Sequence, residues 1–363
     1  MAEIEFTSNE LSSFYELWTS ILGSKDKEID ENLNISRSEK DNREFKQYAK
    51  ELKAVKPDGP IFDGLKKLSA ELFKDNGSIK TFDDFKSFVK DNVSDKYDYA
   101  LTNLYKPFHE FYSSAEVVKE REAAVRALGS FGYGKELGNM YKFFNVSEDF
   151  KIKGNINLYQ TTFTNDGTAV SGGFFMNAAI ADKNDTCLGN SAVQERKVST
   201  PLHESAHLLF GKSKEWLFKN EIDRVLKGKA PALGGASRVV SILKNYFEKN
   251  PEAKRDGNVD DNLSGSMLAA IHESFGASAS ALIDEKKQPG YDAAKDKKRK
   301  WYYGFDGADK LAPIVYPIFK EYISKGKMLD DKFYNKLADN MRDFGLEKGK
   351  HLGQQEHKST LHH

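Results

Sequence analysis

The sequence predicts an α+β fold that is mostly helical, and three observations support this fold class. Apolar residues recur at helical spacing through most of the 363 residues. Polar and apolar residues alternate, as in a half-exposed strand, only in a short central stretch. Gly and Pro clusters separate the periodic runs, and no internal repeat is evident. We therefore expect a small sheet within a largely helical chain.

Residues 1–145 are expected to form a helical N-terminal region. Thr7-Ser-Asn-Glu10 is a capping-box signal, and Leu11 and Phe14 follow it at helical spacing. Amphipathic runs predict further helices at about 45–52, 61–74, 81–92 and 95–128. The segment Ser130-Phe-Gly-Tyr-Gly134 should end the last of them, because glycine interrupts helices.

A second domain is expected over residues 146–346. Two strands should open it, at about 150–159 and 172–181. Helical spacing then predicts helices at about 200–210, 214–227, 236–249, 265–283, 308–319 and 331–344. Residues 347–363 form a polar tail that we expect to be disordered.

The most informative motif lies in Thr200-Pro-Leu-His-Glu-Ser-Ala-His-Leu-Leu-Phe210. His203, Glu204 and His207 form the pattern His-Glu-x-x-His. Four residues make a little over one helical turn, so both imidazoles can converge on one metal ion while the carboxylate reaches its open position. Pro201 suits the first turn of a helix. The motif predicts a metal site, and the alternative is two ordinary histidines on a packed helix.

A catalytic zinc takes three protein ligands and a structural zinc takes four, so a third ligand is needed. The run Gly265–Ile283 is rich in small residues at helical spacing and carries His272 and Glu273. We predict Glu273 as the third ligand, with His272 or neither as alternatives, because neighbours on a helix diverge by about 100°. Without a metal role, Glu273 would cap a helix or form a salt bridge.

The motif, followed by a later helix bearing Glu273-Ser-Phe-Gly-Ala277, resembles the gluzincin group of zinc metallopeptidases. The resemblance covers about residues 199–283. It implies a zincin-like catalytic core, a Zn²⁺ cofactor, peptide or protein substrates and a general base at Glu204. The chain departs from the group in the long interval between His207 and Glu273, and in Ala277, where several gluzincins have an acidic residue that orients a histidine.

The resemblance also implies a mechanism in which Glu204 takes a proton from the attacking water and passes it to the leaving amine. The developing oxyanion needs another donor, and Tyr302, Tyr303, Tyr316 and His272 are the candidates. The 172–181 strand could bind an extended peptide as an edge strand, or be an ordinary core strand. Two other functions remain open: a zincin-like binding or scaffold module without catalysis, and a zinc hydrolase of a non-peptide amide or ester.

Composition limits the other possibilities. Lys and Arg total 55, Asp and Glu total 55, and the two signs are interspersed, so no nucleic-acid partner is indicated. No apolar run is long enough to span a membrane, and Cys187 is the single cysteine.

The first residues lack a secretory leader, which favours the cytoplasm. The order of segments, with Tyr303-Gly-Phe and Val315-Tyr-Pro, is similar to exported bacterial proteins with a metallopeptidase-like core, which favours a secreted or periplasmic protein. Localisation and oligomeric state stay open.

Overall fold

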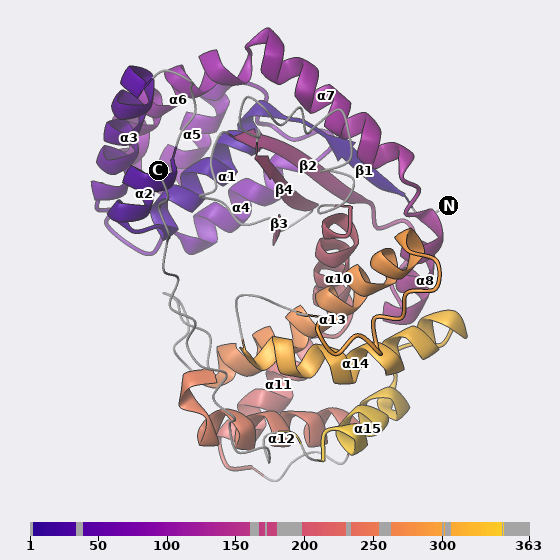
Figure 1. The fold of residues 1–363 in the computed structure, drawn as a ribbon. Helices are drawn as coiled ribbons and strands as arrows, with labels where there is room; N and C mark the ends of the chain where they lie inside the picture. Colours follow the sequence, from indigo (N-terminus) through magenta and orange to yellow (C-terminus); the bar gives the residue numbers. More distant parts are fainter. Residues whose placement is uncertain are drawn as a thin grey trace, which may run out of the picture.

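The computed structural model describes residues 3–33, 39–159, 167–170, 173–179, 198–229, 234–253, 263–299, 301, 306–342 and 344. Helices dominate this part of the chain, and a four-stranded mixed sheet lies among them (Figure 1). The predicted class, α+β and mostly helical, is therefore confirmed. Cys187 and the tail 347–363 lie outside the described residues.

The N-terminal part begins with a short strand and continues as helices. Its elements are β1 (Ile4–Thr7), α1 (Glu10–Gly23), α2 (Asp26–Asn32), α3 (Glu39–Ala54), α4 (Phe62–Leu72), α5 (Phe82–Asn92), α6 (Asp98–Tyr112), α7 (Ala115–Ser130) and α8 (Gly134–Phe144). The single helix expected over 95–128 is wrong, because α6 and α7 are separate. The Ser113 hydroxyl donates to the carbonyl of His109 at 2.7 Å, at the point where α6 ends. Such local side-chain bonds compete with continued helix.

The sheet is completed by β2 (Ile152–Tyr159), β3 (Gly167–Val170) and β4 (Gly173–Ala179). Its strand order is β1-β2-β4-β3, with β1, β2 and β4 parallel and β3 antiparallel to β4. The suggestion that 172–181 supplies an edge strand is wrong. Strand β4 has a partner on each side, because β3 turns back along it, and β3 is the outer strand there.

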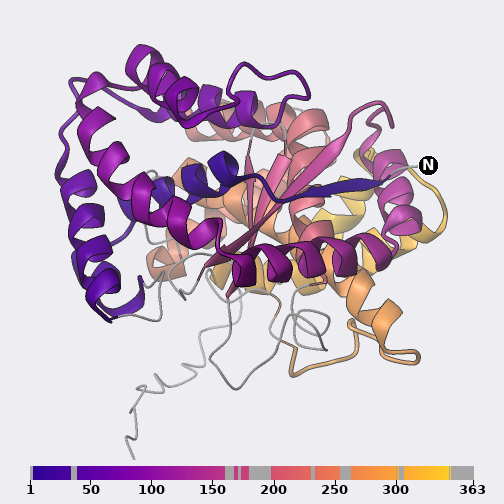
Figure 2. The same ribbon diagram turned by 90° about the horizontal axis from the view of Figure 1, so that it is seen from above.

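The sheet separates two apolar cores. On one face, Ile152 and Phe174 lie in the core shared with α7, α8 and α10–α15. On the other face, Phe175 lies in the core of α1–α6, because successive side chains of a strand point to opposite faces. Helix α7 runs alongside β1 (Figure 2). Helices α1–α6 therefore belong to one core, and the helices from α7 onward belong to the other. The expected domain boundary at residue 145 stays a prediction.

The C-terminal part is helical. Its elements are α10 (Thr200–Ser213), α11 (Glu215–Leu226), α12 (Gly235–Lys249), α13 (Leu263–Lys287), α14 (Asp306–Ser324) and α15 (Asp331–Asn340). Helix α13 packs against both α10 and α14 (Figure 1). Among the described helices, none combines the length and the apolar character that crossing a membrane requires.

Aromatic rings join α8 to the helices around α13. The ring of Phe143 on α8 lies 5.0 Å from that of Phe319, 5.4 Å from that of Phe333 and 6.0 Å from that of Phe275. Phe275 is on α13, two residues from Glu273, so this cluster supports the helix that carries the predicted third ligand. Edge-to-face pairs add to the free energy gained from apolar burial.

We expect Phe143→Ala to lower the free energy of unfolding by about 3–5 kcal/mol, because it leaves a cavity among these rings. Phe143→Leu should cost only about 1.5 kcal/mol, since it keeps most of the volume. Phe62→Ala is the matched control, because the Phe62 side chain is 66% exposed, and its change should stay within about 0.5 kcal/mol. Urea unfolding measures all three. Equal losses at positions 143 and 62 would contradict this account of the core.

Candidate metal centre

Helix α10 presents both motif histidines on one side. It begins at Thr200 with proline in its first turn, and the Ser205 hydroxyl donates to the Pro201 carbonyl at 2.6 Å. The remaining faces are buried in the apolar core through Leu202, Ala206, Leu209 and Phe210. Because that burial fixes the rotation of the helix, the side that carries the histidines is turned toward α13.

Helix α13 approaches α10 closely because its facing side chains are small. A Cβ atom on Gly276 would lie 2.7 Å from Cε1 and from Nε2 of His203, closer than such atoms come in proteins. Ala277 and Ala279 next to it are buried. The lack of a side chain at Gly276 therefore leaves the space that the His203 ring occupies.

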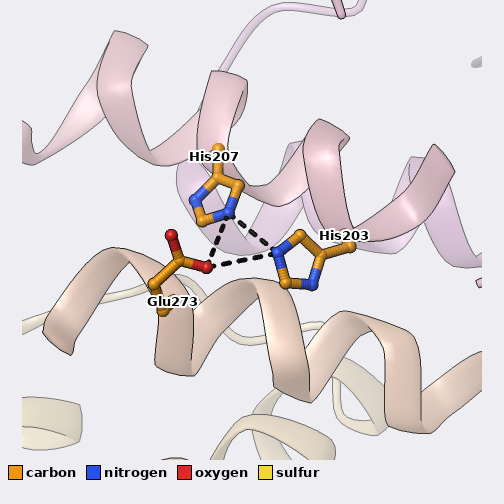
Figure 3. Close-up of side chains that lie close together, drawn as sticks. All are labelled: His203, His207 and Glu273. Atoms are coloured by element: carbon orange, nitrogen blue, oxygen red, sulfur yellow. Dashed lines mark hydrogen bonds and ion pairs between the residues drawn. The ribbon is translucent and has the colours of Figure 1, made fainter. Parts of the chain in front are cut away.

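The three predicted ligands converge between these helices (Figure 3). The Nε2 atoms of His203 and His207 are 3.0 Å apart, and each lies 3.4 Å from Oε2 of Glu273. Their side chains are 17%, 12% and 15% exposed. Neighbouring ligands around a tetrahedral zinc with bonds of 2.0–2.1 Å are roughly 3.3 Å apart. The donor types and their separations both fit such an ion.

The electrostatics of the cluster favour a cation. Burial alone would raise the pKa of Glu273, but attraction to His207 and hydrogen bonds to both histidines hold it well below its usual value. Glu273 is therefore a carboxylate. In the absence of a metal ion, hydrogen on Nε2 of the imidazoles can bond the carboxylate oxygen. A divalent cation at the same point would replace these hydrogens and interact with all three ligand atoms.

Glu204 is buried beside the cluster, and the residue is only 5% exposed. Burial raises its pKa above the usual value for glutamate, while the two histidines and a hydrogen bond from the backbone N–H of Ala169 act in the opposite direction. Ala169 belongs to β3, so Glu204 lies next to the outer strand of the sheet. A carboxyl group whose pKa is raised by burial is suited to proton transfer.

His272 is close to the cluster but directed elsewhere. Its Nε2 lies 3.4 Å from Oε2 of Glu215, and its ring stacks on that of His207 with centroids 5.7 Å apart. Burial lowers the pKa of His272, whereas its hydrogen bond lowers that of Glu215 to about 2. Of the two alternatives for the third ligand, Glu273 is thus the one whose oxygen meets both motif nitrogens.

The candidates for stabilising the oxyanion lie at different distances from the predicted metal ligands. The Tyr316 ring packs against Ala281, Ala293 and Trp301, and burial together with Glu285 raises its pKa. This environment is at the C-terminal end of α13, two helical turns beyond Glu273. Tyr302 and Tyr303 lie outside the described residues. His272 is the candidate that contacts a predicted ligand.

Two residues of the site were missed by the sequence analysis. Ser280 Oγ lies 3.4 Å from Nδ1 of His203, and Gly276 borders the other side of the same ring. Gly276 lies three residues after Glu273 and Ser280 lies seven residues after it, so all three are on one face of the helix. Helical periodicity counted from Glu273 could have identified them.

Comparison with known proteins finds no matching family model, no similar curated protein and no similar solved structure. The geometry of the site is therefore the basis for any functional assignment. The resemblance to gluzincins stays a prediction.

We expect the purified protein to bind about one zinc per chain, and His203→Ala and Glu273→Ala each to lose it, because two ligands hold a catalytic zinc weakly. Elemental mass spectrometry of dialysed protein measures this. His109→Ala is the matched control, since this histidine pairs instead with Glu10 on α1. Zinc retained by Glu273→Ala would move the third ligand to another residue.

Proposed function

We propose that this protein is a zinc-dependent metallopeptidase with a zincin-like catalytic core, acting on peptide or protein substrates. The observation that carries the proposal is the convergence of His203, His207 and Glu273 on one point, with Glu204 beside it. Two neutral nitrogen ligands and one carboxylate form a set that leaves a coordination position for water in zinc hydrolases. A structural zinc would need a fourth protein ligand.

In the proposed reaction, His203, His207 and Glu273 hold the zinc ion. When bound, zinc acidifies a water molecule and polarises the carbonyl to be attacked. Glu204 accepts the proton of the attacking water and delivers it to the amine that leaves. Proton transfer is favoured by a carboxyl group that is less acidic than an exposed glutamate, and burial raises the pKa of Glu204 in that direction.

The sheet supports a substrate with an extended backbone. Strand β3 is an outer strand, it packs against α10, and its Ala169 N–H reaches Glu204. An extended peptide added along β3 would place its backbone beside the general base. This feature favours peptides over small amides or esters, which have no backbone to pair with a strand.

We expect Glu204→Gln to retain zinc and to reduce peptide hydrolysis by about 10²–10⁴-fold, because the amide cannot accept the proton. A fluorogenic peptide library read by mass spectrometry identifies a cleaved sequence, and the variant's kcat is then measured on it. Glu221→Gln is the matched control. Glu221 is also buried, but it accepts a hydrogen bond from Ser237 of α12, so its variant should keep full activity.

Other outcomes assign other functions. Zinc binding with hydrolysis of amide or ester probes, but no peptide cleavage, would replace the peptidase by a hydrolase of small substrates. Zinc binding with no hydrolysis, and wild-type behaviour in Glu204→Gln, would support a zincin-like scaffold module.

A further inference from the structure

Helix α13 contacts both ring nitrogens of His203. Glu273 Oε2 lies 3.4 Å from Nε2, and Ser280 Oγ lies 3.4 Å from Nδ1. Between them, Gly276 borders the ring itself. The three residues are at i, i+3 and i+7, so they form one continuous face of the helix. The imidazole of His203 is thus contacted at both ring nitrogens by one helix, α13.

The serine hydroxyls of α13 have different hydrogen-bond partners. Ser274 donates to the carbonyl of Ile271 and Ser278 to that of Ser274, which are ordinary bonds within a helix. Ser280, by contrast, reaches a ring on another helix. Its separation from Nδ1 is at the long end for a hydrogen bond, and a small shift of the His203 ring would shorten it.

We propose that Ser280 is a positioning residue that orients the His203 ring for cation binding through its contact with Nδ1, and that Gly276 provides the space in which the ring is held. The inference rests on the proposed metal site and adds how one of its ligands is oriented. A neutral imidazole whose Nε2 binds a cation carries its hydrogen on Nδ1, and the Ser280 oxygen can accept that hydrogen. Ser280 would then hold the ring so that the lone pair of Nε2 points to the cation beside Glu273 and His207.

The position of Ser280 also compensates for Ala277. An alanine cannot orient a histidine, and its side chain is buried in the core. Ser280 lies almost one turn further along α13 and meets the ring at the nitrogen that an orienting group must contact. A hydroxyl is a weaker acceptor than a carboxylate, so its effect should be at the low end for such partners.

The first experiment measures zinc affinity by competition with a chromophoric chelator. We expect Ser280→Ala to bind zinc about 10-fold more weakly, and Ser280→Thr, which keeps the hydroxyl, to restore most of the affinity. Ser278→Ala is the matched control and should equal the wild type, because that hydroxyl bonds its own helix. Circular dichroism and thermal unfolding confirm that each variant is folded. Equal zinc affinity of wild type and Ser280→Ala would overturn the proposal while leaving the peptidase intact.

The second experiment observes the Nδ1 hydrogen of His203 in zinc-loaded protein. Proton–nitrogen NMR spectra detect this hydrogen and the rate at which it exchanges with solvent. We expect slow exchange in the wild type and in Ser278→Ala, and faster exchange in Ser280→Ala, which lacks the accepting hydroxyl. Equal exchange in wild type and Ser280→Ala would overturn the proposal, and this result is independent of whether the protein cleaves peptides.

Gly276→Ala tests the space beside the ring. Alanine favours helix more than glycine does, so α13 itself should not be weakened. The added Cβ would displace the His203 ring, and we expect a loss of zinc affinity of at least 10-fold, of the size that misplaced ligands show. Wild-type affinity in this folded variant would show that the ring position is not set there.

Discussion

Two imidazole nitrogens and a carboxylate oxygen lie within 3.4 Å of one another between α10 and α13, and the surrounding structure has to keep them there. Hydrogen bonds or a bound cation can offset the repulsion among these electron-rich atoms only once the two helices have come together. The approach of the two helices therefore depends on packing, through the missing side chain at Gly276 and the apolar face of α10. Much of the C-terminal core can be understood as support for this one contact.

The N-terminal helices contribute indirectly, through the sheet. Phe175 of β4 is buried in their core, and Asn155 of β2 donates from its side-chain amide to the Ser13 hydroxyl of α1. These contacts hold the face of the sheet that is turned away from α10. The opposite face then presents β3 to Glu204. Packing about β4 thus fixes where an extended substrate could lie relative to the general base.

The sequence was most informative where a feature is local. The spacing of His203 and His207 is a property of one helical turn, and Glu273 stood out as a carboxylate on an apolar helix. Strand β1 was missed, because four residues are too few to show alternation and its partner β2 lies far along the chain. The place of β4 inside the sheet also depends on nonlocal pairing with β3. Ser280 belongs to no motif, and although it shares a helical face with Glu273, the sequence does not show that this face meets His203.

The segment between His207 and Glu273 contributes to the site. It holds α11 and α12, and α11 provides Glu215, which holds His272 with its ring stacked against His207. The second motif histidine is thereby confined by a residue of this segment, just as the first is confined by Ser280 and Gly276 of α13. Each imidazole has its own support, so the ligand geometry does not depend on the ion alone.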